Sequence, residues 1–189
     1  SQLVSCNETS KNVSGDVINL THTYPSGGLA GCYGSIPLVT GNSAIVFENN
    51  DTYTITFSPA IQQVDFEIIG VSDDASDNFT FMINGADPTT DANNVISSPS
   101  GIGSPVFSNS TAVIQSHDTG LEVIGNKINI AQDGGNSYGE GGGTIAISNS
   151  VSGISSVTLT FTESGGGGWP ADSAAVEVWV KQTLSVDDF

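Results

Sequence analysis

The residues best suited to chemistry are the aspartates of one short acidic turn. Asp73, Asp74 and Asp77 lie in the segment Asp73-Asp74-Ala75-Ser76-Asp77. Calcium takes six to eight oxygen ligands in flexible geometry, and the carboxylates and carbonyls of a turn supply such ligands. The glycine and glutamate of an EF-hand loop are missing. The turn is a candidate Ca²⁺ site, and the alternative is a solvated turn that caps its own amides. Helping carboxylates would be Asp65, Asp87 or Asp91.

Aromatic residues beside glycine-rich segments form a second candidate site. Trp169 follows the run Gly165 to Gly168, and Tyr138 lies in another glycine-rich stretch. A ring exposed there offers a flat face to a sugar, while nearby carboxylates accept hydrogen bonds from hydroxyl groups. The candidate ligand-binding residues are Tyr138, Glu140, Trp169 and Asp172, and Tyr33 and Trp179 are further possible platforms. The alternative is that Trp169 and Trp179 simply pack at the edge of the core.

Motifs for catalysis are weak. Gly135-Asn136-Ser137-Tyr138-Gly139 satisfies the G-x-S-x-G formula, but the glycines after it cannot begin the helix that a nucleophile elbow needs. Glycoside hydrolysis needs two carboxylates about 5–9 Å apart. The spacing of the late acidic residues does not require such a pair, so we expect no enzyme. The carboxylates considered are Glu140, Glu163, Asp172 and Glu177.

Charge excludes several classes of partner. Twenty acidic residues face three lysines, and arginine is absent, which gives a formal net charge of −17. A nucleic-acid binder needs a cationic face, and an anionic membrane surface would repel this chain. No apolar run approaches the roughly 20 residues that span a bilayer. We expect an extracellular or cell-surface protein whose signal peptide has already been removed.

Cysteines and sequons agree with export. Cys6 and Cys32 would form a disulfide in an oxidising compartment, and the alternative is two reduced, buried thiols. The two histidines show no zinc-finger spacing with these cysteines. Six N-x-S/T sequons are possible glycosylation sites, only modestly more than chance gives. They begin at Asn7, Asn12, Asn19, Asn50, Asn78 and Asn109.

Period-two alternation predicts an all-β chain. Apolar residues alternate with polar ones in about nine or ten short segments, as in residues 64–68, 79–83, 157–161 and 176–180, whose apolar members we expect to face inward. In the first of these segments, Asp65 and Glu67 are expected to point outward. Strands with one apolar face imply a two-sheet antiparallel β-sandwich, jelly-roll-like or alternatively immunoglobulin-like. The pattern of residues 45–57 predicts a hairpin that turns at Asn49-Asn50-Asp51 and ends at Pro59. Residues 85–110 are predicted to form a long irregular loop.

The chain divides at about residue 40. We expect residues 1–40 to form an N-terminal segment closed by the disulfide, either part of the main domain or appended to it, and residues 41–189 to form the sandwich. Residues 53–84 and 143–168 resemble β-sandwich domains of secreted bacterial cell-surface and adhesin-like proteins. The likeness lies in "YTITFSPAIQQVDFEIIGVSDDASDNFTFMING" and "GGGTIAISNSVSGISSVTLTFTESGGGG". It implies export and surface attachment, and it supplies no catalytic residues.

Two functions remain open. The first is a non-catalytic module that attaches to a surface by binding a glycan or other ligand, with calcium as an optional aid. The second is a self-assembling subunit of a fibre or surface layer, in which residues 13–24 add a strand to a neighbouring copy. A glycoside-active enzyme ranks lowest.

Overall fold

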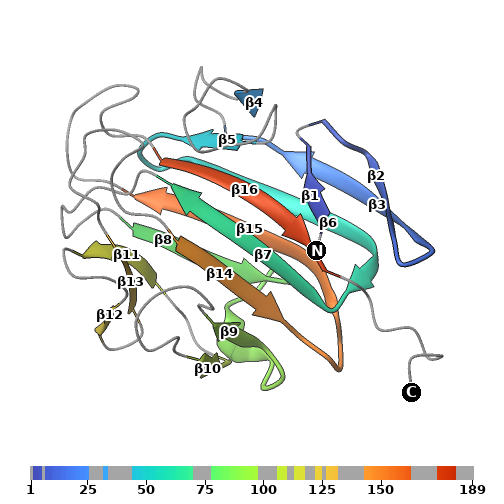
Figure 1. The fold of residues 1–189 in the computed structure, drawn as a ribbon. Helices are drawn as coiled ribbons and strands as arrows, with labels where there is room; N and C mark the ends of the chain where they lie inside the picture. Colours follow the sequence, from blue (N-terminus) through green and yellow to red (C-terminus); the bar gives the residue numbers. More distant parts are fainter. Residues whose placement is uncertain are drawn as a thin grey trace.

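The computed structural model describes residues 2–5, 7–25, 32–33, 44–69, 78–97, 106–109, 113–117, 122–124, 127–131, 143–162 and 174–181. Within these ranges the chain forms two β-sheets that pack face to face, with one short 3₁₀-helix, η1 (Pro88–Thr90), and no α-helix (Figure 1). The predicted all-β sandwich is confirmed.

Within the described ranges, each sheet has eight strands. Sheet A runs in the order β10 (Val106–Ser108), β9 (Val95–Ser97), β14 (Gly143–Ser148), β7 (Gln63–Ile69), β16 (Ala174–Val180), β5 (Ala44–Phe47) and β4 (Cys32–Tyr33), with β1 (Gln2–Val4) also paired to β16. Sheet B runs β12 (Glu122–Ile124), β13 (Lys127–Ala131), β11 (Val113–His117), β8 (Asn78–Ile83), β15 (Ile154–Thr162), β6 (Thr52–Ile61), β3 (Asp16–Thr23) and β2 (Ser10–Val13). Among the described strands, every pairing is antiparallel except that of β11 with β13.

The central strands follow jelly-roll order. Taken along the chain, they are β5, β6, β7, β8, β11, β14, β15 and β16. In sheet A the neighbours are β5, β16, β7 and β14, which are the first, eighth, third and sixth of these strands. In sheet B they are β6, β15, β8 and β11, which are the second, seventh, fourth and fifth. Interleaving of this kind is the double Greek key of a jelly roll, the first of the two predicted topologies.

The core lies between the sheets because every central strand turns its alternate apolar side chains inward. Phe47 of β5 meets Phe79 of β8 edge to face, with ring centroids 5.1 Å apart. Phe66 of β7 lies 6.2 Å from Phe81 of β8, again across the two sheets. The inward residues predicted from alternation are all buried: Val64, Phe66, Ile68, Phe79, Phe81, Ile83, Val157, Leu159, Phe161, Val176, Val178 and Val180.

Two local predictions were wrong. β5 and β6 do not form a hairpin, because β5 pairs with β16 in sheet A and β6 pairs with β3 and β15 in sheet B. The turn between them is closed as in a hairpin, since Asp51 N–H donates to the Glu48 carbonyl at 3.0 Å. The chain nevertheless crosses from one sheet to the other there. Nor does Pro59 end the strand, because β6 continues to Ile61.

The loop predicted over residues 85–110 carries more regular structure than expected. It contains η1 and the two short strands β9 and β10, which extend the edge of sheet A beyond β14. Three-residue strands are too short to show alternation in the sequence, which is why they were missed.

The N-terminal segment contributes to both sheets. β1 pairs with β16 in sheet A, whereas β2 and β3 pair with each other and β3 pairs with β6 in sheet B. Residues 16–23 thus already have a strand on each side within their own sheet. Donation of residues 13–24 to a neighbouring copy would have to break these pairings, and the fibre remains an untested prediction.

Candidate functional site

A hollow on the outer face of sheet A brings together an aromatic ring and two carboxylates. Asp65 and Glu67 point outward from β7, because the residues that alternate with them, Val64, Phe66 and Ile68, face the core. In the sheet register, Asp65 lies opposite Trp179 of β16, and Glu67 lies opposite Thr144 of β14. Asp65, Glu67, Thr144 and Trp179 line a hollow of about 270 Å³, which we call the Trp179 hollow.

The two carboxylates of this hollow are held differently. Asp65 is only 7% exposed. Its Oδ1 accepts a hydrogen bond from Gln63 Nε2 at 2.8 Å, and its Oδ2 lies 3.3 Å from Lys181 Nζ. Glu67 is exposed on the same strand. Asp65 is therefore a fixed acceptor with its charge partly balanced, whereas Glu67 has room to adjust to a bound molecule.

Trp179 contributes an unused donor. Its side chain is half-buried, and its buried Nε1 has no hydrogen-bond partner. A buried N–H left without an acceptor costs about 1–3 kcal/mol. The hollow thus combines an aromatic ring with two acceptor carboxylates, and the same ring carries a buried donor without a partner.

A third carboxylate, that of Glu177, lies opposite Glu67 on the neighbouring strand. Glu177 of β16 is directly opposite Glu67 of β7, although it points away from the core and is only 3% exposed. Like charges directly opposite each other on adjacent strands destabilise a sheet. The sandwich therefore places Glu177, one of the carboxylates considered for glycoside hydrolysis, beside a partner that the sequence did not suggest.

A second hollow, of about 370 Å³, lies at the N-terminal corner. His22 and Tyr24 stack there with ring centroids 5.5 Å apart and planes 5° from parallel. The hollow contains no charged side chain among its described lining residues. Those residues are Asn7, Thr9, Leu20, Thr21, His22 and Tyr24.

Both ring nitrogens of His22 are already used. Nε2 lies 2.8 Å from the Glu8 carbonyl and must donate to it, so in the neutral ring Nδ1 accepts from the Tyr53 hydroxyl at 2.6 Å. Burial raises the pKa of Tyr53 well above its ordinary value of 10.0, and nearby Tyr24 adds to the effect. His22 therefore connects the Glu8 carbonyl to the Tyr53 hydroxyl through its two ring nitrogens.

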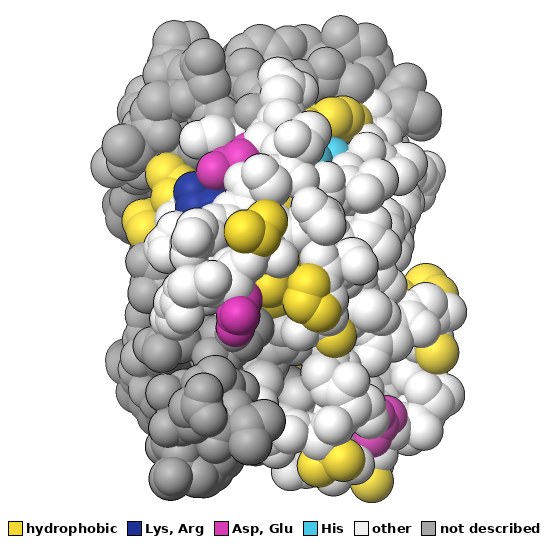
Figure 2. All heavy atoms as spheres, turned by 90° about the vertical axis from the view of Figure 1, so that its right-hand side faces the viewer, with side chains coloured by type: hydrophobic (Ala, Val, Ile, Leu, Met, Phe, Trp, Pro, Cys, Tyr) yellow, Lys and Arg dark blue, Asp and Glu magenta, His cyan; other side chains and the backbone are white. Residues whose placement is uncertain are grey.

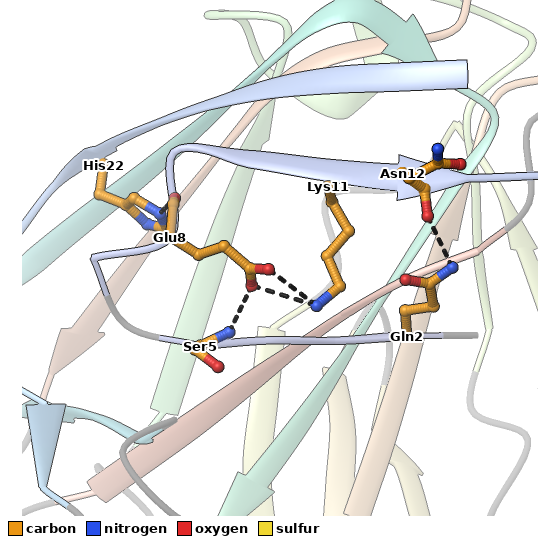
Figure 3. A network of polar contacts seen from close by, with 6 residues as sticks. All are labelled: Gln2, Ser5, Glu8, Lys11, Asn12 and His22. Atoms are coloured by element: carbon orange, nitrogen blue, oxygen red, sulfur yellow. Dashed lines mark hydrogen bonds and ion pairs between the residues drawn. The ribbon is translucent and has the colours of Figure 1, made fainter. Parts of the chain in front are cut away.

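Glu8 holds this corner together (Figure 3). Its carboxylate accepts hydrogen bonds from Ser5 N–H at 2.9 Å and from Lys11 Nζ at 2.9 and 3.1 Å. Its backbone carbonyl accepts the hydrogen bond from His22 Nε2. Gln2 Nε2 donates to the Asn12 carbonyl at 2.8 Å. These bonds connect β1 of sheet A to β2 and β3 of sheet B, which makes the corner a structural joint between the sheets.

Most of the site residues predicted from sequence lie outside the described residues. This applies to Tyr138, Glu140, Trp169 and Asp172, to Asp73, Asp74 and Asp77, and to Cys6. Cys32 is described only as part of the backbone of β4, which pairs with β5. The disulfide, the acidic-turn calcium site and the glycine-loop binding site therefore stay predictions.

The aspartates suggested as calcium helpers have other partners. Asp65 contacts Gln63 and Lys181, as above. Asp87 Oδ1 accepts from the Thr89 backbone N–H at 2.9 Å and caps η1. Asp91 Oδ2 accepts from Asn149 and Ser152 at 3.0 and 2.9 Å. Across the described ranges, no three His, Cys, Asp or Glu side chains come together as a metal site would need.

The six sequon asparagines differ in exposure. Four are exposed and two, Asn78 and Asn109, are half-buried. Asn12 Oδ1 accepts from Gly15 N–H at 3.0 Å, and Asn7 Oδ1 accepts from the Tyr24 hydroxyl at 3.3 Å. Their use as glycosylation sites stays a prediction. The exposed four are Asn7, Asn12, Asn19 and Asn50.

Sequence reasoning did not assemble the Trp179 hollow. It placed Asp65 and Glu67 outward, and it named Trp179 as a possible platform, but it did not bring them together. One signal in the sequence could have indicated the hollow. Asp65 and Glu67 are two residues apart on a strand whose other side chains are apolar enough for the centre of a sheet.

Comparison with protein-family models, with curated proteins and with solved structures finds no match to this chain. In the part of the chain that the structure describes, no helix has the length and apolarity needed to cross a membrane.

Proposed function

We propose that this protein is a non-catalytic, extracellular binding module that holds a saccharide in the Trp179 hollow and so attaches to a glycan-bearing surface. The observation that carries the proposal is that Trp179, whose buried Nε1 has no hydrogen-bond partner, lines one hollow together with Asp65 and Glu67.

Saccharides match this combination of groups. A pyranose has an apolar C–H face that can stack on an indole, and hydroxyl groups around its rim that donate and accept hydrogen bonds. Ligand sites in proteins typically combine an apolar surface with a few placed polar groups. Glu67 would accept from ligand hydroxyls, and the indole N–H would donate to a ligand oxygen after a small movement of the ring.

The negative charge around the Trp179 hollow limits which saccharides can bind there. Asp65, Glu67 and Glu177 lie on two adjacent strands, and the Lys181 ammonium lies 3.3 Å from Asp65 Oδ2. An anionic sugar would be repelled by these carboxylates and by the net charge of −17. The ligand is therefore a neutral sugar or an amino sugar.

A panel of neutral, amino and anionic oligosaccharides tests this proposal by isothermal titration calorimetry. Glu67→Gln keeps the shape of an exposed side chain and removes its charge. A hydrogen bond to a charged group contributes about 1.5–3 kcal/mol, so the affinity should fall roughly 10- to 100-fold. Glu48→Gln, at the β5–β6 turn, is the matched control and should bind like the unmodified chain.

Two results would reject the proposal: no binding to any member of the panel, or equal affinity for Glu67→Gln and Glu48→Gln. The same titrations, followed by chromatography of the sugar, show whether the Glu67–Glu177 pair cleaves it. The proposal expects the sugar to be recovered intact.

A further inference from the structure

Hydroxyl groups dominate the outer face of sheet B across the four strands β3, β6, β8 and β15. The outward side chains of β3, β6, β8 and β15 are mainly threonine and serine, and none of those described is charged or aromatic. Most of these side chains are exposed and the rest are half-buried. The hydroxyl-bearing members, here called the hydroxyl face, are Thr21, Thr23, Thr52, Thr54, Thr56, Ser58, Thr80, Ser156, Thr158, Thr160 and Thr162.

Strand register aligns these residues in rows. Across β6 and β15, three of the facing pairs have a hydroxyl on both sides: Thr52 with Thr160, Thr54 with Thr158, and Thr56 with Ser156. β3 and β8 extend the same rows with Thr21, Thr23 and Thr80. Neighbouring strands lie about 4.8 Å apart and alternate residues repeat every ~6.8 Å along a strand. The hydroxyls therefore repeat in two directions.

Hydrogen bonds fix the central hydroxyls in place. Oγ1 of Thr54 lies 2.8 Å from Oγ1 of Thr158, and Oγ1 of Thr52 lies 3.1 Å from Oγ1 of Thr160. β-Branched side chains are also stiff about χ1. A hydroxyl has one donor and two acceptor positions, so each bonded pair keeps further hydrogen-bonding capacity toward solvent.

The described outward side chains of β3, β6, β8 and β15 carry no charge, in contrast to the chain as a whole, whose net charge is −17. Figure 2 shows how few charged side chains interrupt the uncharged polar surface that the described residues expose on the side it views. Ammonium and carboxylate groups bind water tightly around themselves, which opposes any extended order in the water layer. An uncharged face of hydroxyls and methyls lacks this obstacle.

We propose that the hydroxyl face binds ice. Ice presents a rigid, uncharged lattice of hydrogen-bonding oxygens that repeats in two directions with spacings of the same order as those of a β-sheet. Threonine hydroxyls can hold water at lattice positions, and their methyl groups fill the gaps between. A polysaccharide fits this face less well, because none of its described outward side chains is an aromatic ring that could stack on sugars.

Sheet twist sets the size of the contact. Adjacent strands rotate by about 20–25° relative to each other, so a flat crystal surface cannot follow all four strands. The contact is centred on β6 and β15, where the bonded threonine pairs lie. The activity is accordingly expected as slowed recrystallisation and altered crystal shape rather than as a large depression of the freezing point.

The test is an ice recrystallisation assay in frozen sucrose solution, with single crystals observed under the microscope. Thr158→Lys and Thr54→Lys place a hydrated charge at the centre of the face. Val151→Lys adds the same charge on a turn, where Val151 is 71% exposed and outside sheet B. The unmodified chain and Val151→Lys should slow recrystallisation and facet the crystals, and both threonine variants should lose this activity.

Circular dichroism shows whether each variant is folded. If a lysine variant does not fold, Thr158→Val replaces it, because valine keeps the shape and removes the hydroxyl, and its inhibition should be weaker. The inference is overturned if the unmodified chain leaves recrystallisation at the buffer rate, or if a folded Thr158→Lys or Thr158→Val keeps full activity. Trp179→Phe should leave ice binding unchanged, which separates this outcome from that of saccharide binding.

Discussion

The side-chain amide of Asn149 donates a 3.0 Å hydrogen bond to Oδ2 of Asp91, joining the β14–β15 turn to the loop that follows η1. Asn149 is 0% exposed, and its amide also donates to Asn94 Oδ1 at 2.8 Å. Its own oxygen accepts from the backbone N–H groups of Val151 and Ser152 at 3.1 and 2.8 Å. One buried side chain thus satisfies groups from two loops far apart in the sequence.

Replacing Asn149 with alanine should therefore lower the free energy of unfolding by roughly 2–3 kcal/mol, because Asn94 loses a buried partner and two turn amides lose their acceptor. Urea denaturation at neutral pH measures the change. Ser152→Ala, which removes one exposed hydroxyl from the same network, is the control and should cost about 1 kcal/mol or less. Equal effects for the two variants would show that the buried amide has no special role.

Stability should fall in acid partly through Asp91. Hydrogen bonds from the Asn93 backbone N–H, and then from Ser152 and Asn149, hold the pKa of Asp91 below its ordinary value of 3.8. The folded chain therefore binds this proton less readily than the unfolded chain. The stabilisation is complete above that ordinary value and is lost as the pH falls below it.

Asp91→Asn should accordingly make the free energy of unfolding less dependent on pH below about 4 than in the unmodified chain. Denaturation at a series of acid pH values provides the comparison. Asp87 makes a similar contribution, because the Thr89 hydroxyl and backbone N–H lower its pKa. An Asp91→Asn profile parallel to the original would contradict this account of the loop.

Tyr53 should make the free energy of unfolding fall as the pH rises, the opposite of the effect of Asp91. Burial raises its pKa above 10.0, so the unfolded chain ionises first as the pH rises. The stability contributed by the neutral phenol is complete below pH 10 and is lost progressively above it. Tyr53→Phe should cost about 1 kcal/mol at neutral pH through the lost bond to His22, and its stability should decline less steeply above pH 10. Parallel alkaline profiles would show that Tyr53 is not protected from ionisation.

Contact between the sheets depends on Phe79. Its ring lies 5.1 Å from that of Phe47 in sheet A and 4.9 Å from that of Phe161 on the neighbouring strand. Phe79→Ala should lower the free energy of unfolding by about 3–5 kcal/mol. Met82→Ala on the same strand, where Met82 is 43% exposed, should change it by about 0.5 kcal/mol or less. Comparable losses for both would mean that the aromatic cluster does not dominate packing there.

The fold could be predicted from sequence wherever one strand face is apolar. Alternation at residues 64–68 and 157–161 identified both the strands and their inward residues. It could not tell that β5 and β6 separate into different sheets, because a turn closed by Glu48 and Asp51 has the same local chemistry in either case.

The candidate site was harder to predict because it depends on register. Alternation placed Asp65 and Glu67 on the outer face, but their neighbours Trp179 and Thr144 come from strands more than 70 residues away in the sequence. Register is set by long-range pairing and by the burial of one face of each strand. The rows of the hydroxyl face could not be read from the sequence for the same reason.

The most direct test of saccharide binding follows the indole N–H resonances of the two tryptophans in ¹⁵N-labelled protein, with Trp179→Phe identifying the Trp179 signal. Saturation with a sugar that binds should move the Trp179 resonance strongly, because its Nε1 gains the acceptor it lacks in the free protein. A Trp179 resonance that stays in place while the protein saturates would show that the ligand is held elsewhere.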